Sequence, residues 1–240
     1  MTNQIESQLI SLRLLGMNRT WKALLETRKS HELTLAEGLE ILLQAEAEQR
    51  TGKRFERLVK DAKFRYQASI EELIYNAARG FDRSIISTLA TGDYIQKGES
   101  VLITGSSGCG KSFLTSALGH QACALGYSVR YYNIQKLLLN LKTARLEGTI
   151  VKLFDKLAKT QVLILDDFGL ARIEQQQLMD LMEIIEDRHG RNATIIASQL
   201  PVKNWYDIIG EATIADAILD RLVHTSFRIE IKGESLRKKQ

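Results

Sequence analysis

Apolar residues in roughly the first 90 positions recur at steps of three and four, the spacing that places them on one face of an α-helix. The first such series comprises Leu9, Leu12, Trp21, Leu24 and Leu25. Thr34 and Glu37 form a capping-box pair, which predicts the start of a second helical segment that continues through leucines 35, 39, 42 and 43. Ser69 and Glu72 form a similar pair and predict the start of a third helix.

From residue 99 onward the pattern changes to short β-rich runs that alternate with helical segments. The predicted strands span residues 100–104, 127–132, 162–167, 193–198 and 226–231. Gly126 and Gly190 stand where helices before the second and fourth strands are expected to end. Alternating strands and helices favour a mostly parallel sheet with helices on both faces. We therefore predict a small all-helical N-terminal domain, residues 1–66, followed by an α/β domain, residues 67–240.

Composition is compatible with a folded chain, because 44% of the 240 residues are apolar and only one is proline. The formal net charge of +4 allows a polyanionic partner without requiring one. Cys109 and Cys123 lack the spacing and the histidine partners of a metal site, which favours a reducing compartment without disulfides. No apolar run approaches the about 18 residues of a membrane helix, and the N-terminus lacks a basic leader. We expect a cytoplasmic protein without a membrane partner.

The stretch GSSGCGKS, residues 105–112, fits the phosphate-loop pattern G-x-x-x-x-G-K-[ST] and stands between a predicted strand and a predicted helix. Its backbone N–H groups and the helix N-terminus would face the phosphates of a nucleotide. Lys111 would bind the β- and γ-phosphates, and Ser112 would bind Mg²⁺. The predicted nucleotide-binding residues are Gly105, Ser106, Ser107, Gly108, Cys109, Gly110, Lys111, Ser112 and Phe113. A glycine-rich turn with an exposed lysine is the alternative.

A second phosphate motif follows as VLILDDFG, residues 162–169, in which two aspartates end an apolar strand. Ligands bind at the carboxyl ends of strands in open α/β sheets. Asp166 is the predicted magnesium carboxylate, acting directly or through another ligand, and Asp167 is placed to polarise the water that attacks the γ-phosphate. A turn after the strand, or a helix N-cap, is the alternative for this motif. Ser198 and Gln199 end another predicted strand. One of them could bridge the water, the γ-phosphate and Asp167, or both could simply begin the next loop.

These motifs, together with the run SQLPVKNWYDIIGEATIADAILDRLVHTSFRIEIKGESLRK at residues 198–238, resemble the AAA+ ATPases of the DnaA/DnaC clade. Within that clade the chain looks most like the IstB-type transposition helper proteins of insertion sequences. The resemblance implies a P-loop AAA+ core with a mostly parallel five-stranded sheet and the Ser198 strand between the strands of the two phosphate motifs. It also implies ATP and Mg²⁺ as cofactors. We expect no C-terminal helical lid domain.

By the same resemblance the catalytic residues are Lys111, Asp167 as the water-activating acid, Gln199 at the sensor position and Arg221 at the arginine-finger position. An arginine finger acts on the site of the neighbouring subunit. The alternative for Arg221 is a purely structural salt bridge to Asp216 or Asp220. The chain departs from the family pattern in two ways. It has an Asp-Asp pair where Asp-Glu is common, and we expect no lid. Arg237 is a candidate substitute for the arginine that the lid usually provides.

A basic helical stretch, residues 50–66, is the first candidate DNA contact. Phe55, Leu58, Val59, Ala62 and Tyr66 are predicted to share one face. The opposite face would carry Arg50, Lys53, Arg57 and Lys60, and its contacts with phosphates would be independent of sequence. The alternatives are a solvated surface helix, or a DNA site in residues 134–153 with Lys136, Lys142 and Arg145.

The function that these features favour is an ATP-dependent transposition helper. It would assemble as a homo-oligomer, a ring or a helical filament, on double-stranded DNA, hydrolyse ATP at subunit interfaces and stimulate a cognate transposase. The alternatives are a replicative helicase loader of the DnaC type, a small-molecule P-loop kinase, and a switch protein that binds ATP and barely hydrolyses it.

Overall fold

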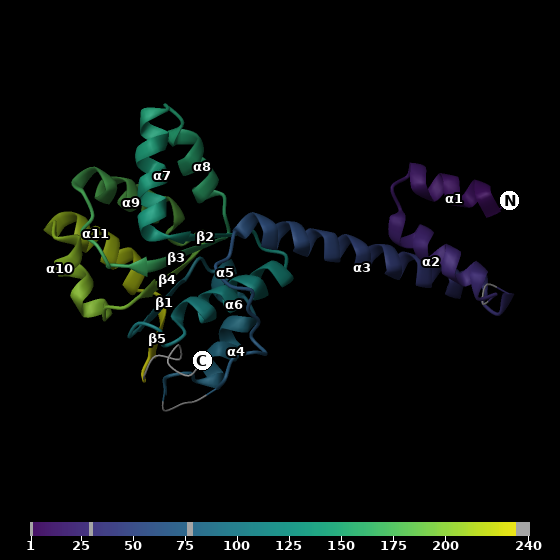
Figure 1. Ribbon diagram of the computed structural model, residues 1–240, viewed down its shortest axis with the longest axis horizontal. Helices are drawn as coiled ribbons and strands as arrows, with labels where there is room; N and C mark the ends of the chain where they lie inside the picture. Colours follow the sequence, from purple (N-terminus) through teal and green to yellow (C-terminus); the bar gives the residue numbers. More distant parts are fainter. Residues whose placement is uncertain (1, 29–30, 76–78, 234–240) are drawn as a thin grey trace. The chain divides into compact units, whose positions relative to one another are not determined.

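The computed structural model describes residues 2–28, 31–75 and 79–233 of the chain (Figure 1). The chain divides into two compact units, Met1–Arg57 and Leu58–Gln240. The boundary between the units lies within one long helix. The division into folding domains after residue 66 stays a prediction. No helix among the described residues is long and apolar enough to cross a membrane.

The first unit contains helices α1 (Thr2–Ser11) and α2 (Leu15–Glu26) and most of α3 (Leu35–Ala62). The capping box that predicts α3 is confirmed, because the backbone N–H and the hydroxyl of Thr34 both donate to Glu37 Oε2 at 2.8 Å. Glu46, a buried acid of α3, accepts a 2.7 Å hydrogen bond from the backbone N–H of Gly16 in α2. A Cβ on Gly16 would lie 2.5 Å from the carbonyl oxygen of Ala45, so only glycine allows this close approach.

The second unit is built on one five-stranded parallel sheet. Its strands are β1 (Ser100–Gly105), β2 (Val129–Asn133), β3 (Val162–Phe168), β4 (Ala193–Ser198) and β5 (Ser226–Ile231). Their order across the sheet is β2-β3-β4-β1-β5. All five predicted strands are confirmed, and so is the position of the Ser198 strand between those that carry the two phosphate motifs.

Helices cover both faces of this sheet, as the alternating pattern predicts. They are α4 (Arg83–Ala90), α5 (Asp93–Gln96), α6 (Lys111–Ala124), α7 (Ile134–Leu146), α8 (Ile150–Ala158), α9 (Gln175–Arg188), α10 (Trp205–Ile209) and α11 (Ala212–Val223). In Figure 1, α4, α5 and α6 lie on one face, and α7, α9 and α11 lie on the other. Leu163 and Leu165 of β3 join the core beneath α7, α9 and α11, whereas Ile164 between them meets α6 at Gly119. This alternation explains why the first four residues of β3, 162–165, are all apolar.

The helix predicted to start at Ser69 is wrong. The Ser69 backbone N–H does donate to Glu72 Oε2 at 2.8 Å, yet residues 64–75 form only turns and irregular backbone. A capping bond satisfies one orphan N–H group but does not supply the packed apolar face that sustains a helix. Here Ile74 is 85% exposed, so the segment lacks such a face. Tyr66 also does not share the α3 face, because α3 ends at Ala62 and Lys63 takes a left-handed φ of 58°.

One fully buried arginine ties together the end of the sheet at which β3 and β4 begin. Arg188, the last residue of α9, donates to the carbonyl oxygens of Leu157, Thr160 and Ala193 and to Thr194 Oγ1. Burial lowers the pKa of Arg188 to about 9, so the guanidinium stays charged at neutral pH. Its hydrogen bonds join carbonyl groups at the end of α8 to those at the start of β4.

We predict that Arg188→Met destabilises the protein by about 3 kcal/mol or more, because the apolar side chain leaves buried carbonyl groups without donors. Urea unfolding followed by circular dichroism measures the change. Arg191→Met is the matched control, since Arg191 is exposed and should shift the free energy of unfolding by less than about 0.5 kcal/mol. Equal effects of the two substitutions would contradict a structural role for the Arg188 network.

Candidate nucleotide-binding site

The predicted phosphate loop connects β1 to α6 and depends on glycine at three positions. Gly105, Gly108 and Gly110 have φ values of 149°, 77° and 106°, which side-chain-bearing residues rarely adopt. A Cβ on Gly105 would lie 2.2 Å from the carbonyl oxygen of Ile231 in β5. Because α6 begins at Lys111, the positive end of its dipole faces the loop. The loop therefore has the geometry of an anion-binding turn.

Lys111 lies within this loop and is nearly buried. Its ammonium donates to the carbonyl oxygens of Gly105 and Ser106, both at 2.8 Å. The loop carbonyls thus hold the cation at the mouth of a cavity of about 470 Å³. The lining residues of this nucleotide cavity are Arg65, Tyr66, Ser107, Gly108, Gly110, Lys111, Ser112, Phe113, Asp167, Leu170 and Gln199.

Three residues of the predicted nucleotide-binding set do not line this cavity. Gly105 packs its backbone against β5. Ser106 donates its hydroxyl to the carbonyl oxygen of Gly233 at 3.1 Å. Cys109 is fully buried beneath the loop. Gly105, Ser106 and Cys109 therefore lie behind the loop, and their role toward a nucleotide stays a prediction.

The two aspartates that end β3 are in different environments. Asp166 is only 1% exposed, and its carboxylate accepts hydrogen bonds from the Tyr131 hydroxyl and, at 2.9 Å, from the backbone N–H of Asp167. Burial and the neighbouring carboxylate raise the pKa of Tyr131, so the phenol stays a donor. Asp167 is half-buried, adopts a left-handed φ of 60° and lines the nucleotide cavity.

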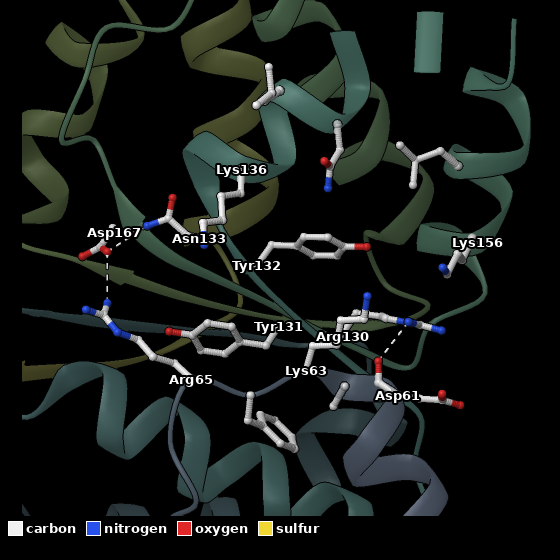
Figure 2. A pocket seen from close by; sticks show the side chains of 15 residues that line it. Asp61, Lys63, Arg65, Arg130, Tyr131, Tyr132, Asn133, Lys136, Lys156 and Asp167 are labelled. Carbon is white, nitrogen blue, oxygen red and sulfur yellow. Dashed lines mark hydrogen bonds and ion pairs between the residues drawn. The ribbon is translucent and has the colours of Figure 1, made fainter. Parts of the chain in front are cut away.

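Two further side chains hold Asp167, and both are absent from the predicted site. Asn133 Nδ2 donates to Asp167 Oδ2 at 2.9 Å, and Arg65 Nη1 lies 3.4 Å from the same oxygen (Figure 2). Asn133 is the last residue of β2, and it lies opposite Asp166 in the parallel pairing of β2 with β3. A polar residue at the end of a predicted strand was therefore an available signal. Arg65 belongs to no motif and reaches the site through tertiary packing.

Ser198 and Gln199, which the sequence leaves as alternatives, have different surroundings. Ser198 is fully buried, donates its hydroxyl to the carbonyl oxygen of Phe168 at 2.8 Å and accepts from the backbone N–H of Leu200 at 3.1 Å. These bonds give it a structural position between β3 and the loop after β4. Gln199 lines the nucleotide cavity, and its sensor role stays a prediction.

Arg221 pairs with neither of the two aspartates considered from the sequence. Its guanidinium forms an ion pair with Glu186 of α9 and donates to the carbonyl oxygen of Ala217 at 2.9 Å. Asp216 and Asp220 are five and one positions away on α11, so they do not face Arg221, and the alternative pairing with one of them is wrong. Arg221 does not line the nucleotide cavity of its own chain. Its arginine-finger role stays a prediction.

The basic residues considered for DNA divide into paired and exposed ones. Lys53, Arg57 and Lys60 are exposed on α3, whereas Arg50 forms a 2.8 Å ion pair with Glu46. In the alternative segment, Lys142 lies 3.7 Å from Glu174, and Arg145 forms a forked pair with the buried Asp180. Lys136 lines a second cavity. Arg237 lies outside the described residues.

A strand–loop–helix phosphate motif beside two strand-end carboxylates, on a sheet with the inserted β4, defines a P-loop nucleotide-binding protein of the AAA+ class. The chain matches the profile of the IstB-like ATP binding proteins over residues 7–240, and it belongs to that family. It is 44% identical to the insertion sequence ATP-binding protein y4pL of Sinorhizobium fredii, over 97% of this chain and 95% of that protein.

Solved structures support the same fold at lower identity. The DnaC helicase loader matches 69% of this chain and 97% of its own with a TM-score of 0.59 and 20% identity. The replication initiator DnaA, solved with AMPPCP and single-stranded DNA, matches 70% of this chain with a TM-score of 0.58 and 18% identity. The matched region is 51% of that DnaA chain. These similarities confirm the predicted α/β core.

We predict that Ser198→Ala and Gln199→Ala separate structure from chemistry. Ser198→Ala removes two buried hydrogen bonds and should lower the free energy of unfolding by about 1–3 kcal/mol. Gln199→Ala changes a half-buried cavity residue and should lower it by less than about 0.5 kcal/mol. Urea unfolding of both variants tests this. A Gln199→Ala variant as unstable as Ser198→Ala would show that Gln199 also serves the fold.

Proposed function

We propose that the protein is an ATPase that uses Mg²⁺ and acts at the interfaces of an oligomer. The observation that supports this most directly is the nucleotide cavity, into which Lys111, Ser112, Asp167 and Gln199 converge from the ends of three adjacent strands. Membership in a family of ATP-binding proteins supports ATP as the ligand. Hydrolysis is the further step that the carboxylates suggest.

The donor set fits magnesium, which binds through one or two protein oxygens and the phosphates of a nucleotide. Ser112 lines the cavity with a hydroxyl at the first turn of α6, whereas Asp166 is buried at the end of β3 outside the cavity lining and would hold the ion through a bound water. When bound, the ion would neutralise charge on the β- and γ-phosphates. Lys111 would bind the same phosphates once they displace it from the loop carbonyls.

Asp167 is the residue that we assign to the attacking water. Its Oδ2 is occupied by Asn133 and Arg65, so its Oδ1 is the atom available to orient a water in the cavity. Gln199 lines the same cavity and would hold the water or the γ-phosphate from the other side. Among the described residues, Arg65 is the arginine that lines this cavity, and it pairs with the aspartates rather than facing the phosphate loop alone.

Arg221 is our candidate for the arginine finger. It lies on α11, outside its own cavity, where a neighbouring copy could receive it. Its only carboxylate partner among the described residues is Glu186, whose side chain is 51% exposed. A surface ion pair of this kind contributes at most about 1 kcal/mol, so docking of a second copy could replace it.

The partners that we propose are double-stranded DNA, a transposase and further copies of the chain in a ring or a helical filament. The relative in S. fredii is named for an insertion sequence, which favours a transposition helper. The DnaA structure contains single-stranded DNA, which supports nucleic acid as a ligand of this fold. The helicase-loader alternative rests on fold similarity alone, since the identity to DnaC is 20%.

We predict that Arg221→Ala keeps ATP affinity and lowers hydrolysis on the order of 10³-fold, and that mixing it with Asp167→Asn restores part of the rate. Each variant supplies the group that the other lacks at a shared site. Phosphate release in the presence of duplex DNA measures the rate, and a fluorescent ATP analogue measures affinity.

Glu186→Gln is the matched control, because it removes the ion pair with Arg221 and keeps the arginine. It should hydrolyse ATP at nearly the wild-type rate. If Glu186→Gln is as slow as Arg221→Ala, or if the mixture shows no recovery, the shared site is ruled out. Lys111→Ala should lose nucleotide binding and sets the background.

We predict that Ala substitution of Lys53, Arg57 and Lys60 together weakens binding to duplex DNA of any sequence and leaves ATP affinity unchanged, because these exposed lysines and arginine would contact only phosphates. Fluorescence anisotropy with two unrelated duplexes measures the affinity. Lys22, Arg28 and Lys97 are also exposed or partly exposed, and their triple Ala variant is a charge-matched control. Equal affinity of the two triple variants would exclude this helix as a specific contact.

A further inference from the structure

A second cavity of about 1110 Å³ lies on the other side of Asp167 from the phosphate loop. Its walls are the end of α3 and the segment after it, strand β2 from Arg130 to Asn133, and helices α7 and α8 (Figure 2). We call it the basic cavity, because its charged lining residues are Lys63, Arg65, Arg130, Lys136 and Lys156 against Asp61 and Asp167.

The cations that line the basic cavity outnumber its carboxylates by five to two. Among the described residues, Lys63, Arg130, Lys136 and Lys156 form no ion pair with a carboxylate. Arg130 instead donates to the backbone carbonyl of Asp61 at 2.9 Å. Burial and repulsion from Arg130 and Lys63 lower the pKa of Lys156. Cations crowded in this way favour binding of an anion.

The shape of the lining indicates an anion with several charges. The cations come from the segment after α3, from β2, from α7 and from α8, around a cavity of about 1110 Å³, so an anion with several charges could contact more of them than a single small anion. The half-buried ring of Tyr132 points across the hollow between Lys136 and Arg130 (Figure 2). Basic side chains interleaved with an aromatic ring are suited to a nucleic-acid strand, whose phosphates pair with the cations and whose bases stack.

Arg65 connects this cavity to the carboxylates of the nucleotide cavity. Its side chain lines both cavities, and Nη1 lies 3.4 Å from Asp167 Oδ2 and 3.7 Å from Asp166 Oδ2. The guanidinium also lies over the ring of Tyr66, 5.5 Å from its centre. With 41% of its side chain exposed, Arg65 is not enclosed by packing. In its present position it neutralises the two carboxylates.

We propose that the basic cavity binds a phosphodiester backbone, and that Arg65 turns toward the bound phosphates and thereby releases Asp166 and Asp167 for the nucleotide. This inference rests on the proposed ATP and DNA binding and names where the two meet. Without this counter-charge, the Asp166 carboxylate would be available to a magnesium ion and the Asp167 carboxylate to the attacking water. Nucleic acid and nucleotide would then strengthen each other's binding, because linkage between two sites is reciprocal.

The site is tested with Lys136→Ala/Lys156→Ala, both exposed lysines whose loss should leave the fold intact. The matched control is Lys152→Ala/Lys203→Ala, which removes the same charge from exposed positions outside the cavity. Anisotropy of a labelled oligonucleotide, single-stranded or duplex, is measured over a salt series. The plot of log affinity against log salt should lose about 2 units of slope in the cavity variant and less than about 1 in the control.

Equal slopes for the two double variants would overturn the basic cavity as a backbone site. Inorganic phosphate is added as a competitor at the same phosphate concentration as the oligonucleotide. Displacement by phosphate would show a single-anion site and would also overturn the proposal. If the wild-type chain binds no oligonucleotide at any salt, the DNA part of the proposed function fails together with this inference.

The coupling is tested by the affinity for a fluorescent ATP analogue with Mg²⁺, with and without saturating oligonucleotide. We expect the oligonucleotide to raise the affinity of the wild-type chain by about 5-fold or more, and Arg65→Ala to remove that gain. Arg65→Lys keeps the charge but not the planar fork and should retain part of it. A gain of the same size in Arg65→Ala would overturn the role of Arg65 while leaving ATP binding itself established.

Discussion

A carboxylate buried at the end of a parallel strand imposes the geometry of everything around it. Asp166 is almost inaccessible to water, and a charge in that position is unstable without hydrogen-bond donors. The Tyr131 hydroxyl and the backbone N–H of Asp167 meet that need. The Asp167 N–H that bonds Asp166 belongs to a residue with a left-handed backbone. At the same place, the pairing of β3 with β4 shifts between Leu165 and Phe168. The irregular end of β3 therefore directs Asp167 toward the nucleotide cavity.

Strand order brings the other groups to the same edge. Because β4 is inserted between β3 and β1, the phosphate loop, the aspartates and Gln199 leave from neighbouring strands. Ser198 holds the loop after β4 to the end of β3, and Gly105 lets the phosphate loop approach β5. At the opposite end of the sheet, Arg188 joins α8, α9 and the start of β4. One end is fixed by a buried structural network, and the other presents its polar groups to a cavity.

Local patterns in the sequence predicted most of this. Strand positions followed from apolar runs. The capping box at Thr34 predicted a helix correctly because an amphipathic segment follows it. The similar pair at Ser69 did not, because no such segment follows. The phosphate loop and aspartates are contiguous motifs. Arg65, Tyr131 and the Glu186 partner of Arg221 are not, since each depends on which segments pack together. For Asn133, the position at a strand end could be predicted from the sequence, but its hydrogen bond to Asp167 could not.

The two arginines near this chemistry carry opposite implications for a single chain. Arg65 lies against its own carboxylates and cancels charge that a magnesium ion and a water would need. Arg221 lies away from its own cavity and cannot supply the charge that a γ-phosphate would need. A lone copy would then have one cation too many at the aspartates and one too few at the phosphate. Nucleic acid in the basic cavity would remove the first obstacle, and a neighbouring copy would remove the second. Under the proposals above, hydrolysis requires both conditions, because each acts on a different charge of the same site.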